Sequence, residues 1–83
     1  MSMSSFEVSL SSIEDVRRFV DAASRCACEI DVCSGRYVTD GKSIMGLFSL
    51  DLSKPVRVVV QGTADDELEF ERNMEALGVR RAE

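Results

Sequence analysis

Apolar and polar residues alternate along residues 6–10 and 28–33, which predicts two strands that each turn one face toward a core. Residues 36–39 are rich in strand-forming side chains and follow a Ser-Gly turn signal, so they form a hairpin with the preceding strand. Residues 56–60 are apolar at most positions, which is typical of a central strand. The pattern therefore predicts four strands.

A first helix is predicted over residues 13–25, where apolar side chains recur at steps of three and four residues. That stripe consists of Ile13, Val16, Phe19, Val20 and Ala23. Two capping patterns fit its beginning, Ser11 with Glu14 or Ser12 with Asp15. Arg17 and Arg18 lie off the stripe, on a face that we expect to be solvated.

Two further helices follow the hairpin. A short one covers residues 44–50. A longer one begins after Thr63, has acids in its first turn and runs to about Leu77, with Gly78 as its C-terminal stop. Its apolar stripe is Leu68, Phe70, Met74 and Leu77. Residues 80–83 are expected to fray. The predicted order of strands and helices is compatible with one antiparallel sheet that carries the helices on one face.

Composition excludes several classes of function. The 83 residues carry 10 Lys and Arg against 15 Asp and Glu, a net charge of −5, which argues against nucleic acid and anionic membranes as partners. No apolar run is long enough to span a membrane, and the first ten residues lack the features of a secretory leader. Histidine is absent, so it cannot be a base, a metal ligand or a phosphate acceptor.

The cysteines, Cys26, Cys28 and Cys33, indicate a reducing compartment, because their number is odd and no export signal is present. We therefore expect a cytoplasmic protein. Cys-x-Cys followed by a single further cysteine lacks the spacing and the fourth ligand of a structural zinc site. We expect neither a metal nor a cofactor.

Residues 42–50, Lys-Ser-Ile-Met-Gly-Leu-Phe-Ser-Leu, resemble HPr, the phosphocarrier family of the bacterial sugar phosphotransferase system, around its regulatory serine. An opening Phe-x-Val strand and the Ala-Ser-Arg end of the first helix extend the resemblance. It implies an α+β open-faced sandwich, a four-stranded antiparallel sheet with three helices on one face. Residues 1–83 would form a single HPr-like domain, related to a phosphoryl-transfer intermediary and not an enzyme.

The resemblance breaks where HPr carries its phosphate, in a His-x-Arg-Pro sequence at the start of the first helix. Counted back from Ser43, the corresponding positions are Ser12, Glu14 and Asp15. The imidazole is missing, and acids replace both the arginine and the proline. One like-charge contact at about 4 Å costs on the order of 4 kcal/mol at an effective dielectric constant of about 20, so these acids would repel a phosphoryl group. Ser12 is better explained as a helix cap, because no base or cation adjoins it.

Ser43 precedes the short helix and is a good N-cap residue, a role worth about 1 kcal/mol. The resemblance adds a second role, phosphorylation by the HPr kinase/phosphorylase. The two roles are compatible, because a phosphate at a helix start forms charge-assisted contacts there. Lys42 is the nearest cation in the sequence.

The short helix has two apolar faces. Ile44, Met45 and Phe48 share one, and Leu47 and Leu50 share the other. A two-layer domain covers only one of them, so the other is exposed. The resemblance implies that Leu47 and Leu50 face the core, and that Ile44, Met45 and Phe48 bind partner proteins, as exposed apolar patches do.

Three hypotheses follow. The first is a regulatory, protein-interaction module that has lost phosphate carriage on histidine. By resemblance, its partners are phosphotransferase-system components, the HPr kinase/phosphorylase or a transcription regulator. The second is a phosphocarrier with another acceptor, Ser12 or a cysteine. The third is a structural domain that dimerises through Ile44, Met45 and Phe48.

Overall fold

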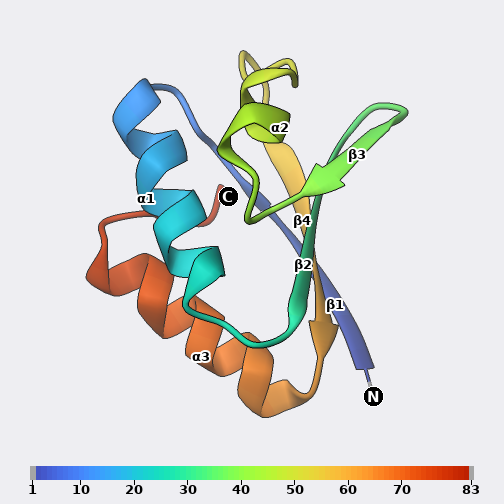
Figure 1. The fold of residues 1–83 in the computed structure, drawn as a ribbon, viewed down its shortest axis with the longest axis vertical. Coiled ribbons are helices and arrows are strands. Elements are labelled where there is room, and N and C mark those ends of the chain that lie inside the picture. Colours follow the sequence, from blue (N-terminus) through green and yellow to red (C-terminus); the bar gives the residue numbers. More distant parts are fainter. Residues whose placement is uncertain (1, 83) are drawn as a thin grey trace.

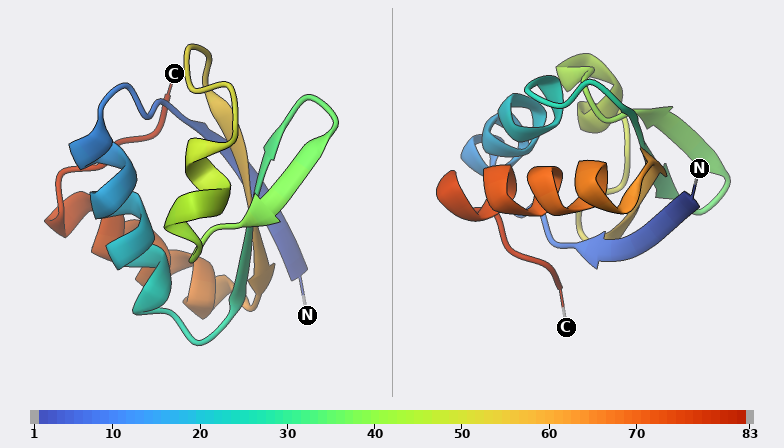
Figure 2. Two further views of the ribbon diagram at one scale, coloured as in Figure 1. Left: turned by 45° about the horizontal axis from the view of Figure 1, so that its top comes forward. Right: turned by 90° about the horizontal axis from the view of Figure 1, so that it is seen from below.

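A four-stranded antiparallel sheet and three helices make up the computed structural model, which describes residues 2–82 and the side chains of residues 5–82. The strands are β1 (Ser2–Val8), β2 (Glu29–Ser34), β3 (Tyr37–Asp40) and β4 (Val56–Gly62), in the order β1-β4-β2-β3. The helices α1 (Ile13–Ser24), α2 (Ile44–Phe48) and α3 (Ala64–Ala76) lie on one face of the sheet (Figures 1 and 2). The predicted open-faced sandwich is confirmed.

β4 occupies the centre because it is apolar on most positions. Its inward side chains Val56, Val58 and Val60 are buried under the helices. Val58 lies between Phe6 of β1 and Val32 of β2 in the register. The other positions of β4 face away from the helices and include the exposed Arg57. β4 therefore alternates between buried positions and positions on the open face, as a sheet with helices on one face requires.

Phe70 joins the layers of the core. Its ring packs edge-on against Phe19 of α1, with centroids 5.6 Å apart at 88°, and lies 6.2 Å from the ring of Phe6. Phe19 and Phe70 are fully buried. A buried aromatic pair contributes about 0.5–1.5 kcal/mol beyond the area that it removes from water. Residues far apart in sequence thereby hold α1 and α3 against the sheet.

Gly78 ends α3 as predicted. Its φ of 83° is in the left-handed region, and the N–H of Val79 donates to the carbonyl of Met74 at 2.8 Å. The N–H of Gly78 itself donates to the carbonyl of Glu75 at 3.1 Å. These two bonds form a Schellman motif, which favours glycine at this position.

The prediction of a frayed C-terminal tail is wrong for residues 80–82, and residue 83 lies outside the residues that the structure describes. Arg81 forms an antiparallel bridge with Val8, and the N–H of Ala82 donates to the carbonyl of Glu7 at 2.8 Å. The guanidinium of Arg81 also lies 4.1 Å from the centre of the Phe6 ring and 2.9 Å from the carboxylate of Glu71. The cation–π contact and the ion pair hold this segment against β1.

Two helical positions in the predicted apolar stripes are also corrected. Ile13 of α1 is 63% exposed and Leu68 of α3 is 45% exposed. Both lie in the first part of their helices. The remaining stripe residues are buried or half-buried, so the predicted direction of each apolar face is right.

Candidate functional site

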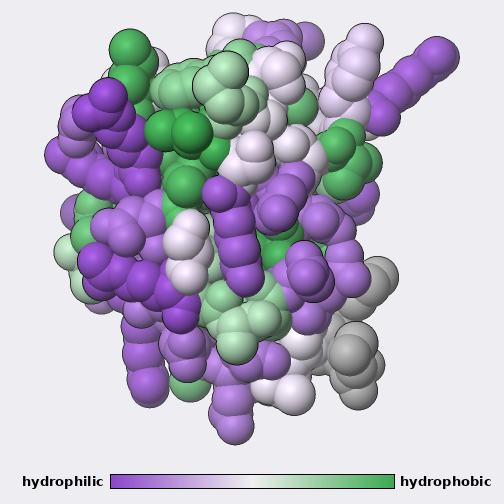
Figure 3. Space-filling model, in the orientation of Figure 1, coloured by the Kyte–Doolittle hydropathy of each residue, from purple (hydrophilic) through white to green (hydrophobic). Residues whose placement is uncertain are grey.

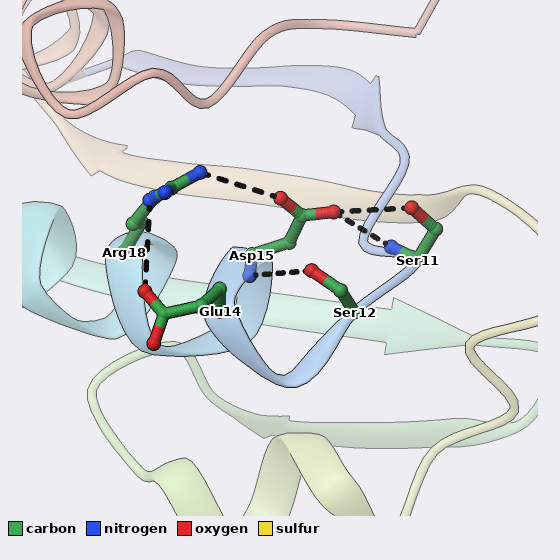
Figure 4. Close-up of polar contacts among 5 residues, drawn as sticks. All are labelled: Ser11, Ser12, Glu14, Asp15 and Arg18. Carbon is green, nitrogen blue, oxygen red and sulfur yellow. Dashed lines mark hydrogen bonds and ion pairs between the residues drawn. The ribbon is translucent and has the colours of Figure 1, made fainter.

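The predicted site residues lie at the N-terminal end of α1 and, in α2, from the N-terminal end to Phe48. The first helix beginning is that of α1. The Oγ of Ser12 accepts the N–H of Asp15 at 3.0 Å, so Ser12 is the N-cap (Figure 4). The carboxylate of Asp15 accepts both the N–H and the hydroxyl of Ser11 at 3.1 Å. Of the two predicted capping pairs, Ser12 with Asp15 is therefore the correct one, and Ser11 binds Asp15 rather than Glu14.

The arginines of α1 pair with these acids. Arg17 lies 3.8 Å from Glu14, and Arg18 lies 3.9 Å from both Glu14 and Asp15. Partial burial acts to raise the pKa of Asp15, but the hydrogen bonds from Ser11 and Ser12 and the charge of Arg18 outweigh it, so the pKa lies below its ordinary value. A negative charge is thus fixed on the first turn at neutral pH. The expected solvated face exists, with its cations beside acids rather than beside Ser12.

The second helix beginning is that of α2. The Oγ of Ser43 accepts the N–H of Gly46 at 3.1 Å, which confirms Ser43 as the N-cap. Its side chain is half-buried, and its own N–H donates to the carbonyl of Asp40 at 3.0 Å. The Nζ of Lys42 donates at 2.8 Å to the carbonyl of Cys26. The residue beside Ser43 is therefore held toward the end of α1.

Gly46 lets α2 approach the sheet. A Cβ atom added there would lie 1.9 Å from the Oγ1 of Thr39 on β3, closer than any real contact. Any larger residue at this position would require the side chain of Thr39 to move. The close approach also brings Leu47 into the core, where it is fully buried.

The two faces of α2 are oriented as the resemblance implied. Leu47 and Leu50 are buried, whereas Met45 is 76% and Phe48 43% exposed. The exception is Ile44, which is half-buried and packs against the core cluster. Ile44 is therefore not a freely exposed member of the patch, because it lies three residues before the buried Leu47 and so beside the buried face of the helix.

A shallow hollow of about 350 Å³ lies between the beginning of α1 and Phe48, the last residue of α2. It is lined by Leu10, Ser11, Ser12, Ile13, Val16, Phe48, Leu52 and Ser53. Apolar side chains gather over the adjoining ends of α1 and α2 (Figure 3). The structure thus brings Ser12 and Phe48 together. It adds Leu52 and also Ile13, which the sequence pattern had assigned to the apolar stripe of the first helix. The sequence did contain one indication of an exposed apolar side chain at this site, because Ile13 is the first residue of its helix.

Other features offer less chemistry. A hollow of about 1010 Å³ runs along α3 and the C-terminal segment and contains none of the predicted site residues. Burial raises the pKa of the Cys26 and Cys28 thiols, which disfavours the reactive thiolate. Within residues 2–82, no group of three or more metal-ligating side chains is found, and no helix is long and apolar enough to cross a membrane.

Comparison with known proteins identifies the family. A family model described as "PTS HPr component phosphorylation site" matches residues 15–78, a range that begins beyond Ser12 and Glu14. The fold is similar to HPr-C-His of Thermoanaerobacter tengcongensis, with 24% identity over 93% of this chain and 94% of that one and a TM-score of 0.67. It is also similar to the phosphocarrier protein HPr of Bacillus anthracis str. Ames, with 24% identity over 96% and 100% of the two chains and a TM-score of 0.69. No curated protein sequence matches. The chain belongs to the HPr family of the bacterial sugar phosphotransferase system.

Proposed function

We propose that this member of the HPr family is a regulatory protein-interaction module that carries no phosphate on histidine and acts through Ser43 and the helix that follows it. The observation that carries the proposal is the exposure of Met45 and Phe48 directly after the capping serine, while Leu47 between them is buried. A partner can thus contact the helix without disturbing the core.

The beginning of α1 is poorly suited to phosphoryl transfer. No histidine exists in the chain, and the hydroxyl of Ser12 is engaged as a cap. Activation of a serine requires a base, and the transferred group requires a cation. The neighbouring groups are instead the carboxylates of Glu14 and Asp15, whose partners Arg17 and Arg18 are already committed to them.

The beginning of α2 is better suited to regulation. A phosphate on Ser43 would add a charge of about −1.5 to −2 at neutral pH beside an apolar contact surface. Its oxygens can still accept the N–H of Gly46, so the cap would survive the modification. The modification would therefore change which partners the surface accepts, with little effect on the fold.

The first experiment tests phosphate carriage. The protein is incubated with enzyme I of the phosphotransferase system and labelled phosphoenolpyruvate, next to a histidine-bearing HPr as positive control. We expect label on the control and none on this chain. Label that disappears in Ser12→Ala, or in a variant without cysteines, would replace the proposal with the hypothesis of an unusual acceptor.

The second experiment tests regulation. Incubation with an HPr kinase/phosphorylase and ATP should place one phosphate on Ser43, detected by mass spectrometry and absent from Ser43→Ala. Binding of both forms to a phosphotransferase-system transcription regulator should depend on the phosphate and be lost in Phe48→Asp. Leu68→Asp on α3 is the matched control, since Leu68 is about as exposed as Phe48. Equal losses in the two variants would contradict the proposed docking helix.

A further inference from the structure

β3 is an edge of the sheet. It pairs with β2 on one side only, and the β2–β3 hairpin projects away from the helices (Figure 1). Two of its side chains, Tyr37 and Val38, are 74% and 64% exposed. An edge strand presents backbone groups that can pair with another chain. Which groups β3 presents follows from its register.

The N–H of Gly41 donates to the carbonyl of Ile30, which continues the register that pairs Val32 with Thr39. Antiparallel pairs alternate between hydrogen-bonded and non-hydrogen-bonded. Tyr37 and Thr39 therefore bond to β2, whereas the N–H and C=O of Val38 point outward.

The neighbouring outward groups follow from the same alternation. The N–H of Asp40 points away from β2, and the planar trans peptide turns the carbonyl of Arg36 the same way. The carbonyl of Asp40 is already taken by the N–H of Ser43. Outward donors and acceptors are thus spaced as an antiparallel partner strand needs them.

We propose that a second copy of this chain docks on β3 as an antiparallel neighbour, with the two-fold axis at Val38. Each copy would donate the N–H of Val38 to the carbonyl of the other copy's Val38. Each would also donate the N–H of Asp40 to the other copy's Arg36 carbonyl. The sheets of the two copies would become one.

The charges around β3 are complementary to themselves in this register. Arg36, the turn residue just before β3, would face Asp40 of the second copy, and opposite charges that face each other across strands stabilise the pair. One carboxylate oxygen of Asp40 accepts the N–H of Lys42 at 2.9 Å and the other would meet the guanidinium. Tyr37 would lie opposite Thr39 and Val38 opposite the second copy's Val38, so both exposed uncharged side chains of β3 gain a neighbour. Registers centred on Arg36 or on Asp40 would instead place like charges opposite each other. The charge pattern therefore selects the register centred on Val38.

The predicted dimer is weak, because β3 is only 4 residues long. A stable interface buries about 1,200–2,000 Å², and a single short strand pair provides less. We expect a dissociation constant on the order of 0.1–1 mM. The inference does not depend on the proposed function, because the predicted bonds are made by backbone groups of residues 36–40 and not by Met45 or Phe48.

Sedimentation equilibrium tests the dimer on the full chain between about 10 μM and 2 mM, a range that spans the expected dissociation constant. The mass should rise from 9.2 kDa toward twice that value. Val38→Pro removes the outward N–H and leaves the bonds to β2 intact, as proline on an edge strand does. Arg36→Asp faces Asp40 with a second carboxylate and should weaken association at least about tenfold. Arg72→Asp on α3 and Phe48→Asp on α2 should associate like the parent chain.

Three outcomes would overturn the proposal: a mass of 9.2 kDa at the highest concentration, unchanged association of both Val38→Pro and Arg36→Asp, or loss of association in Phe48→Asp alone. The last would assign dimerisation to α2. Amide hydrogen exchange of the parent chain gives an answer that needs no variant. Exchange at Val38 and Asp40 should slow as the concentration rises, and concentration-independent exchange would contradict pairing.

Discussion

The ammonium group of Lys42 donates a 2.8 Å hydrogen bond to the carbonyl oxygen of Cys26, just beyond the C-cap of α1. The last turn of α1 contains no basic residue of its own. The negative end of the helix dipole is therefore met by a cation from the loop that leads into α2. One contact thus couples the end of α1 to the residue beside Ser43.

Replacement of Lys42 by methionine should lower the free energy of unfolding by about 1 kcal/mol, because the carbonyl of Cys26 loses a charged donor and the methionine keeps the apolar stem. Urea denaturation measures the loss. Lys54→Met, in an exposed loop, is the control and should change stability by less than about 0.5 kcal/mol. Equal losses would show that the contact with Cys26 does not stabilise the fold.

Gly46→Ala should destabilise the protein by about 2 kcal/mol or more, since the new methyl group would overlap the Oγ1 of Thr39. Thr39→Ala removes that oxygen and leaves the Cβ of residue 39 at 3.1 Å from the new methyl. The double variant should therefore be more stable than the sum of the single losses predicts. A double-mutant cycle from urea denaturation measures this coupling, and additive losses would contradict the clash.

Asp15 should make part of the stability depend on pH. Its pKa lies below the ordinary value of 3.8 in the folded chain, so its carboxylate stabilises the fold fully above that value. This stabilisation is lost as the pH falls through 3.8 toward the folded pKa. The difference in unfolding free energy between the parent and Asp15→Asn should shrink over that range. Ser11→Ala removes one donor and should reduce the effect; a difference that grows at low pH would contradict it.

Leu47 and Met45 are two positions apart on α2, and their replacement by alanine should destabilise the protein to very different extents. Leu47→Ala empties a fully buried site and should cost about 2–5 kcal/mol, measured by urea denaturation. Met45→Ala should change stability by less than about 0.5 kcal/mol because the side chain is exposed. Similar costs at both positions would mean that the helix is rotated from the orientation described here.

Histidine alone should not restore phosphate carriage. Ser12→His retains the carboxylates of Glu14 and Asp15 beside the acceptor, and these repel the incoming phosphoryl group. We expect at least about tenfold slower labelling from enzyme I than in the triple variant Ser12→His/Glu14→Arg/Asp15→Pro, in which that repulsion is removed. Rapid-quench measurement of acid-labile label distinguishes the two. Equal rates would show that the acids do not matter.

The order of the elements was predictable because it depends on local patterns. Ser12, Ser43 and Gly78 act on backbone groups within four or five residues, so their roles are visible in sequence. β1 extends to Ser2, beyond the predicted start at residue 6, because Ser2 pairs with Gly62. Such pairing is a tertiary contact that no local pattern encodes.

The site was only partly predictable for the same reason. The exposure of Met45 and the burial of Leu47 follow from helical periodicity once one face is assigned to the core. Periodicity predicts which side of a helix faces the core. It does not predict how far along the helix the neighbouring elements cover that side. Ile13 therefore shares the α1 stripe and is still exposed, and the contact of Arg81 with Phe6 had no local signal.

Tyr37 is the single tyrosine of a chain without tryptophan, and its ring stands on the outermost strand. The near-ultraviolet emission of the protein therefore originates at the rim of the sheet and not in its interior. Melting of the core should alter this emission little, whereas a neighbour that covers the rim should alter it clearly. Intrinsic fluorescence thus reports whether another molecule covers the outermost strand. Unfolding is better followed by circular dichroism.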